Sequence, residues 1–149
     1  MLIQQVIRDP EVVQIIVKNV DGSGSITTGL GVALVGAGAS IDGVSATKYA
    51  AANVRTFVGV AAEDIPINGY GRVTAWGLAQ SVAISNVGTS ITITRGDTLK
   101  PGAVAGTFFS SLASEAISTL LYKYVVAAST PVAISTGSQS YCHGIVRAL

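Results

Sequence analysis

Apolar and polar positions follow one another along this chain in short runs broken by glycine, a pattern that predicts β-strands joined by tight turns. Residues 11–20, EVVQIIVKNV, are β-branched and apolar and end at the glycine-rich turn DGSGS. Residues 89–95, TSITITR, alternate isoleucine with threonine, which is the period-two pattern of a half-buried strand. Further strands are predicted at residues 29–38, 54–65, 71–84, 103–109, 122–129 and 142–149.

The turn signals fix how these strands connect. The segment GRVTAWGLAQSVAI, residues 71–84, predicts two strand halves with a bulge or tight bend at Gly77. Residues 96–102, GDTLKPG, predict a turn before the next strand. Short strands and frequent turns together predict a mainly β fold, a small antiparallel β-barrel or sandwich with at most one or two short helices.

Three segments depart from the strand pattern. Residues 110–124 carry apolar side chains at spacings compatible with one short helix. Residues 45–54 are rich in alanine and fit either a second helix or an extended connection. At the N-terminus, residues 1–10 are apolar and close with RDP, so we expect an extended arm that pairs with a neighbouring subunit or, alternatively, a frayed end. Residues 11–149 then form a single β domain.

Charge changes the picture more than any other feature of the composition. Only 11% of the residues are charged, whereas soluble domains average roughly 25%. A surface with so few charges favours association with other protein, so we expect the chain to work in an assembly. The alternative is a monomer whose surface is kept polar by serine and threonine.

The distribution of charge also excludes several partners. The net charge is +1, and lysine and arginine are scattered along the chain without any basic block, so nucleic-acid binding is not expected. The uncharged stretches, such as residues 23–41, are rich in glycine, serine and threonine and would insert poorly into a membrane. The first ten residues lack the features of a signal peptide.

No set of residues in the sequence predicts catalysis, a metal site or a bound cofactor. The only histidine, His143, follows the only cysteine, Cys142, and adjacent strand positions point to opposite faces of a sheet. Glu63 and Asp64 alternate in the same way and precede a proline, so they fit a solvated strand end or a turn cap. The glycine-rich segment GLGVALVGAG lacks the spacing of a phosphate-binding loop. We therefore expect a protein that is not an enzyme.

Three motifs occur in an order that resembles the decoration, or cement, proteins of tailed-phage heads. They are FVGVAAEDI, then GYGRVTAWGLAQSVAI, then GDTLKPG, and the chain ends on the strand-like GIVRAL. The resemblance implies a β-tulip-like barrel that binds the outer surface of the capsid and stabilises the contacts between capsomers. It implies the major capsid protein and sister copies, in a homotrimer, as partners. The protein would be made in the cytoplasm of the bacterial host and end on the virion.

The resemblance and the composition together suggest which residues make these contacts. The arm would contribute the apolar residues Leu2, Ile3, Val6 and Ile7. The β domain would contribute the aromatic residues Phe57, Tyr70 and Trp76. Each has a second interpretation, because an aromatic residue on a strand also commonly belongs to the core.

Two other classes of protein share these features. A subunit of a phage tail or baseplate would have the same composition and differ in symmetry. A small carbohydrate-binding β-barrel would use Trp76 and Tyr70 as a stacking platform for a sugar.

Overall fold

The chain forms eleven strands and one 3-10 helix within the residues that the structure describes. The structure is a computed structural model, and it describes residues 12–35, 44–86, 91–102, 104–110, 124–129, 132–135 and 137–148. The strands are β1 (Val13–Asn19), β2 (Gly31–Leu34), β3 (Ser45–Lys48), β4 (Phe57–Ala61), β5 (Tyr70–Ser85), β6 (Ile91–Ile93), β7 (Thr98–Pro101), β8 (Phe108–Ser110), β9 (Tyr124–Ala127), β10 (Val132–Ile134) and β11 (Gln139–Arg147). The 3-10 helix η1 spans Ala51–Thr56.

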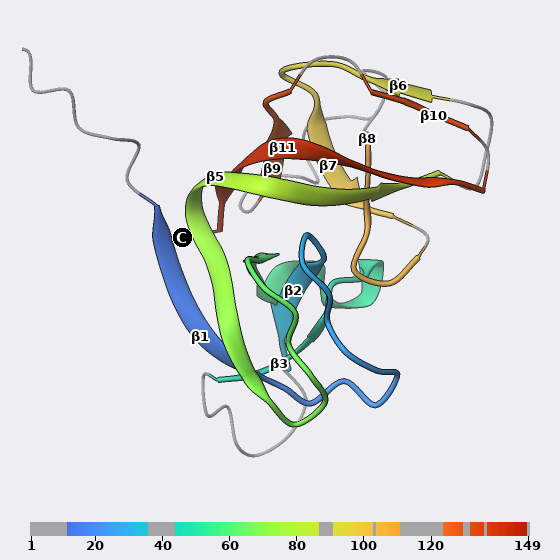
Figure 1. The fold of residues 1–149 in the computed structure, drawn as a ribbon. Helices are drawn as coiled ribbons and strands as arrows, with labels where there is room; N and C mark the ends of the chain where they lie inside the picture. Colours follow the sequence, from blue (N-terminus) through green and yellow to red (C-terminus); the bar gives the residue numbers. More distant parts are fainter. Residues whose placement is uncertain are drawn as a thin grey trace, which may run out of the picture.

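Five strands close into a barrel. Their order is β1-β3-β2-β4-β5, and β5 pairs back with β1. Neighbours run antiparallel except β1 and β3, which are parallel, with Lys18 paired with Ser45. Figure 1 shows this ring in the blue to green part of the chain. Because the ring is closed, none of these five strands has an unpaired edge along its full length. The predicted mainly β fold and small barrel are confirmed.

The remaining strands extend the sheet from the other side of β5. The order continues as β5-β11-β9-β7-β8, and β8 returns to β5 through one parallel pair, Ile84 with Phe108. Strands β6 and β10 form a separate two-stranded sheet, which lies at the upper right of Figure 1. Ile93 of β6 and Ile134 of β10 are both buried in the same core as β11. Strands β6 to β11 thus form a second unit, which is joined to the barrel through β5.

β5 is the strand that both parts of the molecule share. Its first half, from Tyr70 to Trp76, pairs with β1, and its second half, from Trp76 to Ser85, pairs with β11. Between the halves, Gly77 has a φ of +97°, a conformation that residues with a side chain rarely adopt. The pairing register also shifts on both sides of Gly77, as at β-bulges. In Figure 1, β5 rises beside β1 and then turns to run along β11. The predicted bend at Gly77 is confirmed.

Two groups of buried side chains fill the fold. The first core, from the barrel strands and the turns beside them, consists of Val17, Ile26, Leu30, Val32, Ala46, Ala61, Ile65, Val73 and Ala83. The second core contains Ala33, Tyr49, Phe57, Val60, Ala79, Val82, Ile84, Ile93, Leu99, Phe108, Val125, Ala127, Ile134, Cys142, Val146 and Ala148. Near the end of β5, Ala83 belongs to the first core, while its neighbours Val82 and Ile84 belong to the second. This part of β5 is therefore buried on both faces and separates the two cores.

The turn and strand predicted between residues 96 and 109 were placed wrongly. Residues 98–101 form β7, and the chain turns afterwards, at residues 104–107, before β8. Asp97 ends the preceding turn, because its carboxylate accepts hydrogen bonds from the amide and the hydroxyl of Thr94 at 2.9 and 3.0 Å. Leu99 is then free to be buried, with only 2% of its surface exposed, as a strand residue.

Other predicted elements have mixed outcomes. Residues 45–54 contain both an extended segment, β3, and the start of η1, and the burial of Ala46 explains the strand. Strands β3, β7 and β10 were not predicted. The candidate helix at residues 110–124 falls almost entirely outside the described residues. The predicted arm, residues 1–10, lies outside them as well.

Candidate functional site

The sequence-predicted contact residues have different positions in the fold. Leu2, Ile3, Val6 and Ile7 lie outside the described residues. Tyr70 and Trp76 are on the surface of β5, with 64% and 41% of their areas exposed. Their role in an interface stays a prediction.

The prediction for Phe57 was wrong. Its side chain is only 1% exposed and packs with Tyr49 and Phe108, with ring centroids 4.7 and 6.0 Å from Phe57. Because β4 is covered on both faces, the first residue of this strand points into the second core rather than toward a partner. The sequence could not show this, since a two-sided strand and a one-sided strand both accept phenylalanine.

The outer surface of the β1–β5 pair exposes large apolar groups. We call it the β1–β5 face: Gln14, Ile16 and Lys18 on β1, with Tyr70 and Arg72 on β5. Ile16 is 65% exposed and lies opposite Arg72, and Tyr70 lies opposite Lys18. Residues directly opposite on antiparallel strands share a face of the sheet, so these side chains form one surface. Ile16 and Tyr70 are thus diagonal neighbours on the outside of the pair, each directly opposite a basic residue.

The charge of Arg72 on this face is compensated within the chain. Its guanidinium donates from Nη2 to the Glu63 carboxylate at 2.9 Å, and its amide donates to the other Glu63 oxygen at 2.9 Å. The side-chain hydrogen bond from Arg72 is the main reason that the pKa of Glu63 lies below its usual value. At Arg72 a partner that covers the face would therefore meet a neutral ion pair, while Lys18 adds a cation to the same face.

A second set of exposed apolar side chains lies near the bend of β5 at Gly77. Trp76 is paired with Arg147 of β11, and Ile145, two residues earlier on β11, is 40% exposed. Since Ile145 and Arg147 point to the same side of their strand, the indole and the isoleucine lie on one surface. Trp76 is therefore a surface residue at the junction of the two halves of β5.

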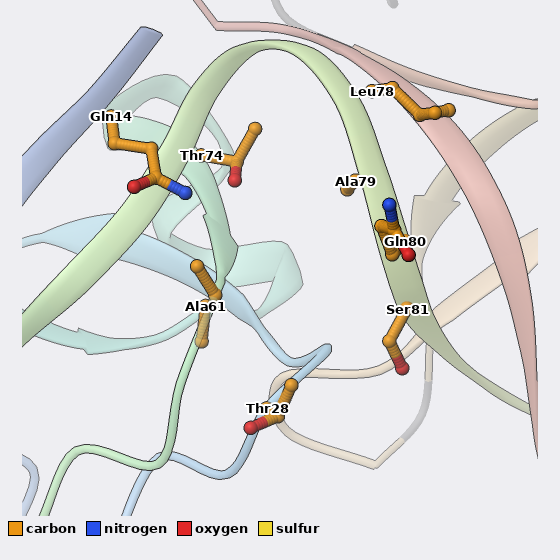
Figure 2. Close-up of a pocket in the computed structure, with 9 residues that line it drawn as sticks. Gln14, Thr28, Ala61, Thr74, Leu78, Ala79, Gln80 and Ser81 are labelled. Carbon is orange, nitrogen blue, oxygen red and sulfur yellow. The ribbon is translucent and has the colours of Figure 1, made fainter. Parts of the chain in front are cut away.

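A pocket of about 180 Å³ lies under the bend of β5. Its polar lining comes from Gln14, Thr28, Thr74, Gln80 and Ser81. Its apolar lining comes from Ala61, Ala62, Leu78 and Ala79. Figure 2 shows Gln14 and Thr74 on one side of the bend, Gln80 and Ser81 on the other, and Thr28 below them. We call this the elbow pocket.

The loop that carries Thr28 is fixed by Asp64. The carboxylate of Asp64 accepts hydrogen bonds from the amide of Thr28 at 2.6 Å and from its hydroxyl at 2.8 Å. The backbone hydrogen bond is the first cause of the lowered pKa of Asp64. Together with the Glu63–Arg72 pair, this confirms that the two adjacent carboxylates serve as local caps rather than as a facing acid–base pair.

Asp21, the most buried carboxylate among the described residues, is also structural. One of its oxygens accepts from the amide and hydroxyl of Ser23, and the other from the Thr47 hydroxyl and the Lys48 amide, at 2.6–3.0 Å. Burial alone would raise the pKa of Asp21, but these hydrogen bonds outweigh it and hold the pKa well below its usual value. Asp21 thus ties the turn after β1 to β3.

Cys142 and His143 point to opposite sides of β11, as the sequence predicted. Cys142 is 4% exposed, and burial raises the pKa of its thiol to about 11, against an opposing hydrogen bond with Ser129. His143 is exposed. The thiol is therefore protonated at neutral pH and is a poor nucleophile. Among the described residues, no three His, Cys, Asp or Glu side chains gather as a metal site would require.

Comparison with known proteins adds no further assignment. No protein-family model and no curated protein matches this chain. Within the described ranges, no helix has the length and apolar character needed to cross a membrane.

Proposed function

We propose that this chain is a structural protein of a phage head, a decoration or cement protein that binds the outer surface of the capsid and stabilises the contacts between capsomers. The observation that carries the proposal is the β1–β5 face, where Ile16 and Tyr70 are about two-thirds exposed on a chain with only 11% charged residues. Large exposed apolar groups on rigid strands are typical of surfaces that other protein covers.

The energetics of the face favour burial against a partner. Covering the exposed part of Ile16 would stabilise a complex by about 1–2 kcal/mol at ordinary coefficients for apolar area. The tyrosine adds a large apolar ring with a hydroxyl that can reach the polar rim. Because Arg72 is already paired with Glu63, burial there does not leave an isolated charge.

The residues that carry the family resemblance lie in the elements that shape this surface. The segment beginning at Phe57 forms β4 and the turn with Glu63, and the next segment forms β5. A closed barrel with a long shared strand suits a protein that must resist deformation rather than turn over a substrate. On this proposal the partners are the major capsid protein and sister copies in a homotrimer, and the arm residues Leu2, Ile3, Val6 and Ile7 add contacts on the shell.

The proposal is tested by adding purified protein to phage capsids that lack it. Co-sedimentation measures binding, and release of DNA on heating measures stabilisation. We expect binding that is strongly weakened by Tyr70→Asp and retained by Tyr141→Asp, a matched exposed tyrosine on β11. Equal binding by both variants would remove the β1–β5 face from the proposal. Binding to tails but not to heads would instead assign the protein to the tail.

A further inference from the structure

We propose that the elbow pocket binds one neutral, hydroxyl-rich ring, namely a single pyranose unit of a carbohydrate. The inference goes beyond the capsid role and does not depend on it. It is carried by the side chain of Thr74, a residue that is only 3% exposed and whose hydroxyl opens into the pocket without a hydrogen bond to the described part of the chain.

Thr74 is an exception among the buried polar residues. Six of them are described: Asn19, Asp21, Thr74, Ser85, Asn86 and Thr107. The other five all form hydrogen bonds through their side chains, the Ser85 and Thr107 hydroxyls with each other. Thr74 is only 3% exposed, yet no hydrogen bond joins its hydroxyl to another described residue. Among the described residues no fully buried side-chain nitrogen or oxygen lacks a hydrogen-bond partner, so the small exposed part of Thr74 includes its hydroxyl oxygen, which is open to a ligand in the pocket.

The side chains around Thr74 offer a matching set of donors and acceptors. Gln14 and Gln80 each present an amide, and Ser81 presents a hydroxyl. Among the described residues, none of these three side chains makes a hydrogen bond within the protein. An amide both donates and accepts, and so does a hydroxyl, which is what adjacent sugar hydroxyls require of a site.

The remaining lining fits the rest of a sugar ring. Ala61, Ala62, Leu78 and Ala79 supply an apolar wall for its C–H groups. Among the described residues no charged side chain lines the pocket, and the nearby carboxylates of Asp64 and Glu63 are bonded to Thr28 and Arg72. A charged ligand would therefore lose its hydration without gaining a counter-ion.

The volume sets the size of the ligand. A space of about 180 Å³ corresponds to roughly six water molecules at the ~30 Å³ that each occupies in the liquid. That is enough for one sugar ring, whereas pockets for larger ligands range from about 300 to 1,000 Å³. We therefore expect one ring of a glycan to enter and the neighbouring rings to remain outside.

The stacking surface predicted from the sequence is not part of this site. Neither Trp76 nor Tyr70 lines the elbow pocket. Recognition here depends on hydrogen bonds and small aliphatic groups, so we expect weak binding of a single sugar, with a Kd of about 1–10 mM.

The test is a titration of the full chain, followed by its amide NMR spectrum, with methyl glycosides of glucose, galactose and mannose and with N-acetylglucosamine, up to about 100 mM. We expect saturable shifts at Thr74, Gln80 and Ser81 for at least one of these sugars. Thr74→Val preserves the shape of the side chain and should weaken binding about tenfold. Thr92→Val, at an exposed site on β6, should leave binding unchanged.

A second variant keeps the test decisive if Thr74→Val unfolds the chain. Gln80 is exposed and outside both cores, so Gln80→Leu should fold and lose binding, whereas Gln139→Leu on β11 should not. Absence of saturable shifts with every neutral sugar would overturn the proposal. So would equal binding by Gln80→Leu and the parent chain, or stronger binding of glucuronate or glucosamine than of the neutral sugars.

Discussion

Gly59 of β4 lies directly against the carbonyl oxygen of Thr74 on β5, so that a Cβ atom at Gly59 would overlap it. Gly59 also has a φ of +149°, which L side chains rarely adopt. The next residue, Val60, pairs with Thr74. This close approach of two backbones lies beside the register shift in β5 and holds Thr74 where its hydroxyl faces the elbow pocket.

Gly59→Ala should therefore destabilise the fold strongly. The methyl group would clash with backbone rather than with a movable side chain, and the φ angle adds strain, so we expect a loss of about 3 kcal/mol. The free energy of unfolding in urea is the measurement. Gly22→Ala is the control, because a Cβ there meets nothing within 4 Å, and a similar loss in both variants would contradict this account.

Acid should weaken the fold through Asp21. The folded-state pKa of this carboxyl is below its unfolded value of about 3.9, so its stabilising effect is complete above pH ~4. The effect is lost as the pH falls toward the folded-state pKa. Asp21→Ala should cost about 2–4 kcal/mol at neutral pH and flatten the acid limb of the stability profile.

Thr47→Val offers a milder version of the Asp21 experiment. It removes one of the hydrogen-bond donors to the carboxylate and should move acid unfolding to a higher pH. Thermal unfolding followed by circular dichroism from pH 2 to 7, a range that spans the usual titration of carboxyl groups, measures both effects. An unchanged acid limb in Asp21→Ala would show that another group controls it.

The thiol of Cys142 should resist modification while the chain is folded. With a pKa of about 11, only about one thiol in a thousand is ionised at pH ~8, and the side chain is buried. We expect labelling by a thiol reagent to be at least about 100-fold slower than in the chain unfolded by guanidinium. Equally fast labelling in both states would contradict the burial.

Truncation of Phe57 should destabilise the fold strongly, whereas truncation of Tyr70 should have little effect. Phe57→Ala removes a ring from the second core and should cost about 3–5 kcal/mol of stability. Tyr70→Ala, on the surface, should change the free energy of unfolding by about 0.5 kcal/mol or less. Urea unfolding measures both changes in the free energy of unfolding. A small change for Phe57→Ala would contradict its place in the core and make Phe57 a candidate interface residue again.

The sequence predicted those parts of the fold that depend on local pattern. The period-two strands and the bend at Gly77 follow from side-chain alternation and from the φ angle that glycine permits. The parallel β1–β3 pair that closes the barrel joins residues far apart in the chain, and no local pattern encodes it. The turn and the strand predicted between residues 96 and 109 were placed wrongly, because the side chain of Asp97, and not the later glycine, ends the turn.

The elbow pocket could not be predicted from the sequence. Thr74 is in an ordinary strand pattern, and only the shift of register near Trp76 and the contact with Gly59 place it under the bend. Gln80 and Ser81 approach the same space from the other half of β5. Nothing in the spacing of these residues indicates that they share a site.

The most direct test of the claim that other protein covers the sparsely charged surface is the mass of the protein in solution, because sister copies are the first partners proposed for it. Light scattering at low concentration should give about three times the 15.1 kDa of one chain. Ile16→Glu, which places a charge on the β1–β5 face, should lower the mass to that of a single chain while circular dichroism stays unchanged. A single-chain mass for the unaltered protein at every concentration would contradict the proposal that its copies cover one another.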